Sequence, residues 1–236
     1  MTWPFENDTS GIVKRISNRS ISANRKRNIF IVLTIVLASA LLSAIVLYGF
    51  GVMQETQNRN QKTAQIMYHA ISEQQGQELY KQEEIAWVGE FFNAFSEQVN
   101  HSTVNFTYAN ADMLTSQSMP YSGDLPASEN EIVVQESFLD SLGYSNELGQ
   151  TIQIPFSDGT THDFKLTGIL DVKTGDIGRY TAIISKELVR QQYGDGGMID
   201  YYIGLKGAQN MSEEEATNYA NTLAQQLNIS DDNVIV

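Results

Sequence analysis

The residue types that most often carry out chemistry are few and widely spaced in this sequence. Its three histidines, His69, His101 and His162, lie far apart, and none belongs to a pair with metal-ligand spacing. There is no cysteine, which excludes a thiol nucleophile, a thiolate metal site and a disulfide scaffold. We therefore predict no metal-binding residues and interpret the histidines as surface or structural residues.

Three short motifs resemble parts of known sites. Lys173-Thr174-Gly175 matches a triplet of penicillin-binding enzymes, but no Ser-x-x-Lys supplies the nucleophile. Asp158-Gly159 and Asp195-Gly196-Gly197 lack the alternating ligands of a calcium loop, and turns explain them better. No Gly-x-x-x-x-Gly-Lys-[Ser/Thr] loop is present to bind ATP. We predict no catalytic and no cofactor-binding residues, and a protein that is not an enzyme.

Aromatic residues at Trp87, Phe91 and Phe95 recur every four positions. If this stretch is helical, they form a stripe that fits a partner; if it is a strand, they enter the core from both sides. We favour the core, because buried aromatic residues vastly outnumber binding ones.

An apolar run follows the basic stretch Arg25-Lys26-Arg27-Asn28. The segment 29–52 contains 24 uncharged residues, which as a helix cover about 36 Å, more than the ~30 Å hydrocarbon core of a bilayer. Ala38-Ser39-Ala40 imitates a signal-peptide cleavage site, but cutting there leaves an exposed apolar N-terminus. We therefore predict an uncut transmembrane helix.

The charge on the two sides of this run predicts its orientation. Residues 1–28 contain six basic and two acidic residues, a net charge of +4, and the rest of the chain has a net charge of −17. Because Lys and Arg near a span stay on the cytoplasmic side, we expect residues 1–28 inside and residues 54–236 outside the cell membrane. The acidic outer part argues against a nucleic-acid partner.

Two flanking segments leave alternatives open. Ile12, Val13 and Ile16 share one helical side, and Lys14, Arg15 and Arg19 supply positive charge. This pattern fits an amphipathic helix on membrane lipid and equally a disordered basic tail held by anionic lipid. After the span, residues 53–65 are polar, and we interpret them as a stalk that is either a helical continuation or a tether.

The outer region reads as an α+β domain with two lobes. Strand, helix and strand follow one another in 65–95, with a helix start at Ser72-x-x-Gln75, and again in 200–236, with Ser212-x-x-Glu215. Two such units predict a ferredoxin-like lobe, residues 66–124 and 199–236. Between them, residues 125–198 predict an inserted β-rich lobe with a helix ended by Gly143 and a hairpin at Asp158-Gly159.

The inserted segment carries a family resemblance. It contains Gly123-x-Leu125-Pro126, Glu131-Ile132-Val133-Val134, Leu142-Gly143, Leu148-Gly149-x-x-Ile152 and Leu166-Thr167-Gly168-Ile169. With the basic segment, the span and the β-α-β unit before it, this order resembles the FtsX-like permeases of ABC transporters. It is similar to their first span plus the MacB-type extracytoplasmic core domain.

The resemblance implies a partner ATPase in the cytoplasm, a permease homodimer or heterodimer, and coupling of ATP hydrolysis to export or extracytoplasmic signalling. Family members export peptides, antibiotics or lipoproteins, or regulate cell-wall enzymes. Such permeases have three more spans after the outer domain, so we expect this chain to be the N-terminal part of one. The alternative is a single-span membrane-anchored sensor or ligand-binding protein. A third possibility is an anchored extracellular enzyme, but we recognise no set of nucleophile, base and orienting group in this sequence.

Overall fold

The structure is a computed structural model that describes residues 9–172, 179–194 and 199–236. The chain divides into two compact units, Met1–Thr56 and Gln57–Val236. Among the described residues, those of the first unit are helical, and the strands lie in the second unit.

The first unit contains helix α1 (Ser10–Ala23) and most of helix α2 (Arg25–Lys62). Residues 10–23 are thus helical, as in the first of the two alternatives, and Ile12, Val13 and Ile16 are exposed on them. Whether α1 contacts lipid stays a prediction.

Helix α2 contains a 29-residue stretch, Arg25–Met53, that is long and apolar enough to cross a membrane; among the described residues it is the single such helix. The threonine and serine hydroxyls inside this stretch donate to backbone carbonyls of the same helix. Thr34 Oγ1 donates to the Phe30 carbonyl at 2.8 Å, and Ser43 Oγ donates to the Ser39 carbonyl at 2.9 Å. Such bonds let polar side chains enter a bilayer without an unpaired donor. The helix continues to Lys62, so residues 53–62 are helical rather than a tether.

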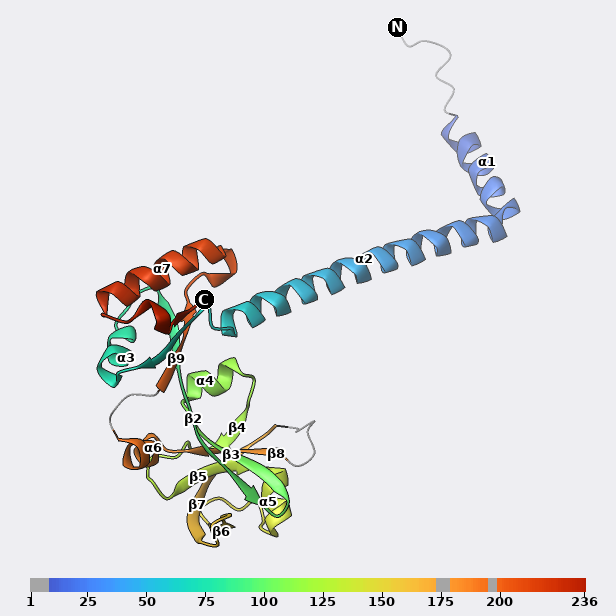
Figure 1. Ribbon diagram of the computed structural model, residues 1–236. Helices are drawn as coiled ribbons and strands as arrows, with labels where there is room; N and C mark the ends of the chain where they lie inside the picture. The colour runs from blue at the N-terminus through green and yellow to red at the C-terminus, as the bar shows by residue number, and fades with distance from the viewer. Residues whose placement is uncertain (1–8, 173–178, 195–198) are drawn as a thin grey trace. The chain divides into compact units, whose positions relative to one another are not determined.

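The predicted β-α-β units form one four-strand region of the second unit. Its strands stand in the order β10-β1-β9-β2, with antiparallel neighbours. They are β1 (Ile66–Ile71), β2 (Ile85–Val99), β9 (Ile199–Leu205) and β10 (Val234–Ile235). Helices α3 (Glu73–Leu79) and α7 (Glu213–Gln226) pack on one face of these strands (Figure 1). This arrangement confirms the α+β prediction.

Both predicted helix starts are capping boxes. The Ser72 side chain accepts from the Gln75 backbone N–H, and the Gln75 side chain accepts from the Ser72 N–H. Ser212 and Glu215 repeat the arrangement at α7. These bonds satisfy backbone donors that a helix N-terminus leaves unpaired.

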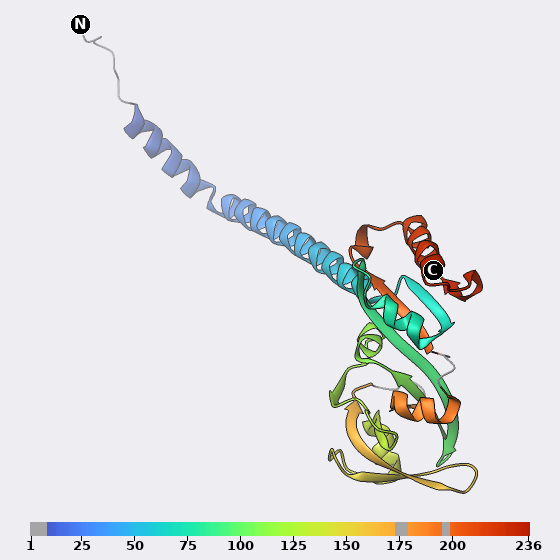
Figure 2. The same cartoon turned by 90° about the vertical axis from the view of Figure 1, so that its left-hand side faces the viewer.

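Strand β2 belongs to two parts of the sheet, as Figure 2 shows. Its first half, Ile85 to Phe91, pairs with β9, and its second half, Phe91 to Val99, pairs with β3 (Ser102–Ala109). Beyond β3 the sheet continues in the order β8-β5-β7-β4, and β6 pairs with β7. These strands are β4 (Tyr121–Gly123), β5 (Glu131–Gln135), β6 (Thr151–Pro155), β7 (Thr161–Leu170) and β8 (Arg179–Ile184).

A second hydrophobic core lies on these strands, beneath helices α5 (Glu136–Leu142) and α6 (Lys186–Tyr193). Gly143 ends α5 in the left-handed conformation at φ 80°, and the β6–β7 hairpin forms as predicted. Val104 and Phe106 of β3 also lie in this core.

Strand β3, and the helix α4 (Ala111–Ser116) after it, were missing from our prediction. The lobe boundaries at 124/125 and 198/199 stay predictions, and β3 favours an earlier start for the second lobe.

The aromatic stripe lies on a strand, and its side chains pack from both sides of the sheet. Phe95 stacks on Phe106 with ring centroids 4.6 Å apart, whereas the Phe91 ring meets the Tyr202 ring edge-on at 6.4 Å. Both side chains are half-buried. Phe91 and Phe95 pack against the cores, as we expected, whereas Trp87 is half-buried, and its ring lies beside Gly204 of the neighbouring strand β9.

Gly76 makes the close packing of α3 on β9 possible. A Cβ atom at this position would overlap the ring of Tyr201, which is fully buried. We expect Gly76→Ala to lower the free energy of unfolding by about 2 kcal/mol, because overpacking a rigid site outweighs the better helix propensity of Ala. Gln77→Ala is the control, because Gln77 is the exposed neighbour of Gly76; this substitution should leave the free energy of unfolding unchanged or raise it slightly. Urea unfolding of the chain in detergent micelles, followed by tryptophan fluorescence, measures both; equal stability of Gly76→Ala and wild type would contradict this packing.

Candidate functional site

The three histidines lie at separate places, as their spacing predicts. His69 is exposed, with Nδ1 2.7 Å from Asp200 Oδ1. His101 lies in the turn between β2 and β3, and the His162 ring lies 4.2 Å from the Phe156 ring on the β6–β7 hairpin. Within the described ranges, no three His, Cys, Asp or Glu side chains are grouped to hold a metal ion.

The short motifs behave as turns where the structure describes them. The Asp158 carboxylate accepts from the Thr160 backbone N–H at 2.8 Å and from its hydroxyl at 2.6 Å, which closes the hairpin turn. Lys173-Thr174-Gly175 and Asp195-Gly196-Gly197 lie outside the described residues.

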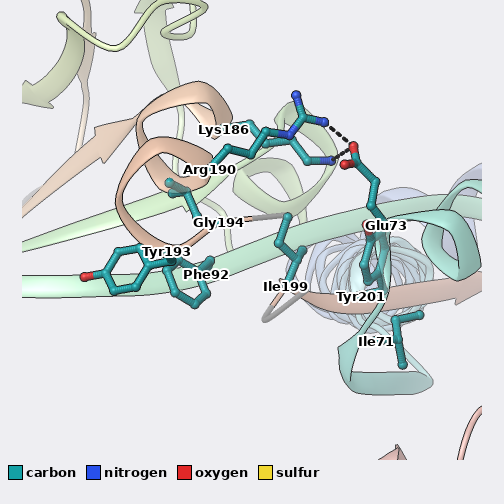
Figure 3. A pocket seen from close by; sticks show the side chains of 10 residues that line it. Ile71, Glu73, Phe92, Lys186, Arg190, Tyr193, Gly194, Ile199 and Tyr201 are labelled. Carbon is teal, nitrogen blue, oxygen red and sulfur yellow. Dashed lines mark hydrogen bonds and ion pairs between the residues drawn. The ribbon is translucent and has the colours of Figure 1, made fainter. Parts of the chain in front are cut away.

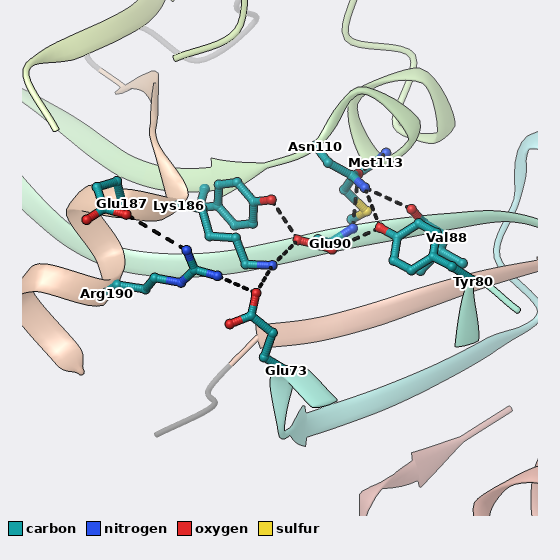
Figure 4. A network of polar contacts seen from close by, with 10 residues as sticks. Glu73, Tyr80, Val88, Glu90, Asn110, Met113, Lys186, Glu187 and Arg190 are labelled. Atoms are coloured by element: carbon teal, nitrogen blue, oxygen red, sulfur yellow. Dashed lines mark hydrogen bonds and ion pairs between the residues drawn. The ribbon is translucent and has the colours of Figure 1, made fainter. Parts of the chain in front are cut away.

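A cluster of polar side chains lies where β2 changes partners from β9 to β3, and none of the sequence patterns described above predicts it. We call it the joint cluster (Figure 4). It connects α3, whose Leu79 packs in the first core, with α6, whose Leu188 and Val189 pack in the second. Its members are Glu73, Tyr80, Glu90, Tyr108, Lys186 and Arg190.

Glu90 is the buried centre of the joint cluster, with a side chain only 6% exposed. Its carboxylate accepts hydrogen bonds from the hydroxyls of Tyr80 at 2.8 Å and Tyr108 at 2.6 Å. Lys186 Nζ lies 2.9 Å from the same carboxylate. A buried carboxylate is tolerated when it is paired and hydrogen-bonded, and Glu90 meets both conditions.

Lys186 and Arg190 connect the joint cluster to the partly exposed carboxylate of Glu73. Lys186 Nζ lies 3.2 Å from Glu73 Oε1, and an Arg190 guanidinium nitrogen contacts the same oxygen. The Glu73 side chain is 34% exposed and the Arg190 side chain 38%. Two cations from α6 therefore converge on one carboxylate from α3.

Local sequence signals place these side chains. Ser185 caps α6: its Oγ accepts from the Leu188 backbone N–H at 3.1 Å. Within α6, Leu188 and Val189 face the second core, while Lys186 and Arg190, four residues apart, share the side facing Glu73. The capping box at Ser72 fixes Glu73 in the first turn of α3.

The electrostatics of the cluster keep its donors and acceptors in complementary states. Burial, followed by the charge of Glu90 and the hydrogen bond to it, raises the pKa of Tyr80 and Tyr108, so both remain donors. Partial burial alone would raise the pKa of Glu73, but the hydrogen bonds and charges of Lys186 and Arg190 lower it. We find no arrangement of nucleophile and base among these residues, and the cluster is suited to joining two structural parts.

The lowered pKa values predict acid sensitivity. Glu73 is one such group; another is Glu131, whose pKa is lowered by backbone N–H bonds from Ala127 and Ser128. A carboxyl group whose pKa is lowered in the folded state stabilises the fold at pH values above its unfolded pKa, here 4.5, and this contribution is lost as the pH falls through the folded-state pKa. We expect the urea concentration at the unfolding midpoint to decrease when the pH is lowered below about 4.5. The decrease should be smaller in a Glu73→Gln, Glu131→Gln double variant. Identical pH profiles of the two proteins would contradict the assignment.

Comparison with known families gives one match that covers most of the chain. Residues 29–222 match the family described as the MacB-like periplasmic core domain. The chain belongs to this family. The match confirms the resemblance to FtsX-like and MacB-like ABC permeases, and with the apolar helix it indicates a membrane-anchored protein with an extracytoplasmic domain.

Solved structures agree on the fold. The crystal structure of the periplasmic region of MacB from Actinobacillus actinomycetemcomitans superposes with a TM-score of 0.50 at 13% identity, covering 72% of this chain and 86% of that one. The crystal structure of the extracellular domain of the noncanonic ABC-type transporter YknZ from Gram-positive bacteria superposes with a TM-score of 0.50 at 10% identity. The superposition covers 72% of this chain and 96% of that one. Comparison with curated protein sequences finds no significant match. The structural likeness supports the MacB-like α+β architecture.

Proposed function

We propose that this chain is the N-terminal part of an ABC transporter permease subunit that couples ATP hydrolysis in the cytoplasm to export or signalling outside. The observation that carries the proposal is the family match, which runs from the apolar helix into the outer domain. The printed sequence contains no Gly-x-x-x-x-Gly-Lys-[Ser/Thr] loop, and in the proposal a cytoplasmic ABC ATPase carries out the hydrolysis.

The proposed orientation follows from charge. The segment before the span has a net charge of +4, so it lies in the cytoplasm, and the acidic residues 54–236 lie outside. The exposed apolar side chains of α1, with Lys14, Arg15 and Arg19 between them, fit the anionic inner surface of the membrane.

Contacts inside the second unit supply a route for mechanical coupling. The backbone N–H of Gln65, just after α2, donates to the Ile203 carbonyl of β9 at 2.9 Å, and the Gln65 side chain accepts from the Leu205 N–H at 2.8 Å. Strand β1 follows directly and leads through Ser72 to Glu73 of the joint cluster. In the proposal, a displacement of the α2 end moves β1 and β9 and reaches the joint cluster.

The proposed partners are a cytoplasmic ABC ATPase, a second permease subunit in a homodimer or heterodimer, and membrane lipid. A peptide, antibiotic or lipoprotein is the proposed class of exported substrate. The rival function, a single-span receptor, requires no ATPase. Purification from native membranes in mild detergent distinguishes the two, because only the permease retains an ATPase subunit.

Single cysteines test the orientation without background, since the chain has none of its own. We expect Gln226→Cys, at the exposed end of α7, to react with a membrane-impermeant maleimide on intact spheroplasts. Asn18→Cys, exposed on α1, should react only after permeabilisation. The reverse pattern would place the outer domain in the cytoplasm and refute the proposal.

A further inference from the structure

A small cavity borders the joint cluster (Figure 3). Its volume is about 30 Å³, enough for one or two water-sized groups. Its polar edge consists of Glu73, Lys186 and Arg190. Its apolar lining comes chiefly from Ile71, Phe92, Val189 and Ile199.

The polar edge has the chemistry of a carboxylate receptor. Lys186 and Arg190 both reach a single oxygen of Glu73, as Figure 3 shows. Paired cations that converge on one point bind an anionic oxygen strongly, and a guanidinium suits a carboxylate in particular. The Glu73 carboxylate thus occupies the position that an external carboxylate would take.

Tyr201 supplies an independent sign of a missing acceptor. Its side chain is fully buried and lines the cavity, and its hydroxyl has no hydrogen-bond partner among the described residues. Burial, reinforced by the negative charges of Glu90 and Glu73, raises the pKa of Tyr201, so the hydroxyl remains a donor. A buried donor without an acceptor is costly, and a ligand oxygen would remove that cost.

The position of Glu73 allows its carboxylate to move away from Lys186 and Arg190 into solvent. Its side chain is one-third exposed and belongs to the first turn of the seven-residue helix α3, so a rotamer change moves it to solvent without moving the helix. An incoming carboxylate then restores the charge balance with Lys186 and Arg190, and Glu90 keeps its own contacts. The space that Glu73 vacates enlarges the apolar cavity beside it.

We propose that Lys186, Arg190 and the Tyr201 hydroxyl form a binding site for the carboxylate of a small apolar ligand, and that Glu73 occupies this site as an internal competitor. The carboxylate takes the place of Glu73 between the two cations. The apolar part of the ligand lies against Phe92 and Val189. The site does not depend on the transport proposal.

Calorimetry on the full chain in nanodiscs tests the site with two carboxylates, N-acetyl-leucine and hexanoate, which represent a peptide C-terminus and a fatty acid. Because an internal group competes at an effective concentration in the millimolar range, we expect at least one probe to bind Glu73→Gln roughly tenfold or more tighter than wild type. N-acetyl-leucinamide, which lacks the carboxylate, should not bind.

Two further variants separate this site from a general charge effect. Glu187→Gln removes an exposed carboxylate 3.8 Å from Arg190 on the same helix, and it should leave probe binding as in wild type. Arg190→Gln should abolish binding while the urea midpoint shows that the variant is folded. If Glu73→Gln binds neither carboxylate more tightly than wild type, or binds the amide equally well, the proposal is wrong. Binding is measured without an ATPase, so either result leaves the permease proposal to its own test.

Discussion

Lys186→Met is expected to lower the free energy of unfolding of the outer domain by about 3 kcal/mol, because breaking a buried ion pair leaves an uncompensated charge. Glu90, 6% exposed, would retain only the hydroxyls of Tyr80 and Tyr108, and Glu73 would lose one of its two cations. Met keeps the length of the Lys side chain, so the loss of charge is the main change. Urea unfolding in detergent micelles, followed by tryptophan fluorescence, gives the value.

Two comparisons show whether burial is the cause. Lys81 pairs with Glu78 at 2.6 Å, but its side chain is 65% exposed, so Lys81→Met should change the stability by less than about 1 kcal/mol. The double variant Lys186→Met, Glu90→Gln should recover a large part of the loss, since no buried charge remains unpaired. Equal effects of Lys186→Met and Lys81→Met would refute the role of Glu90 as a buried charged centre.

Phe106→Ala is expected to lower the free energy of unfolding by about 4 kcal/mol, the typical cost of emptying an aromatic site in a core. The Phe106 side chain is fully buried, stacked on Phe95 at 4.6 Å, with the rings of Phe156 at 5.5 Å and Phe164 at 6.3 Å. These rings come from β2, β3 and the β6–β7 hairpin, so the cavity would weaken the contacts among all three. The same urea experiment measures the loss.

Phe50→Ala is the matched control, because Phe50 is 67% exposed and lies in the apolar stretch of α2, outside the second unit. It should leave unfolding of the outer domain unchanged. Phe106→Leu fills most of the site and should cost less than half as much as Phe106→Ala. A loss below about 1 kcal/mol for Phe106→Ala would show that the second core is not organised around this ring.

The elements with local signals could be predicted from the sequence. Ser72 with Gln75, and Ser212 with Glu215, are capping pairs within one helical turn, and both mark helix starts in the structure. Gly143 ends a helix because only a residue that tolerates positive φ fits there. The apolar helix follows from length and the absence of charge alone.

Strand β3 and the joint cluster depend on distant residues, which is why they were missed. The alternation of Val104 and Phe106 with polar neighbours was a usable strand signal, but the parallel pairing with β8 joins residues more than seventy positions apart. Glu90 and Lys186 are separated by 96 positions, and each alone reads as an ordinary charged residue in a strand and at a helix start. Their significance follows from burial, which no local pattern of charge reveals.

In the proposed function, an ABC ATPase lies on the cytoplasmic side of this chain. A photoreactive amino acid at Asn18, exposed on α1, crosslinked in native membranes and analysed by mass spectrometry, tests it most directly. We expect a crosslinked partner that contains a Walker-type P-loop, and no such partner from the same probe at Gln226 on the outer domain. Repeated capture of other proteins at Asn18, with no ATPase among them, would refute the permease proposal and favour a single-span receptor.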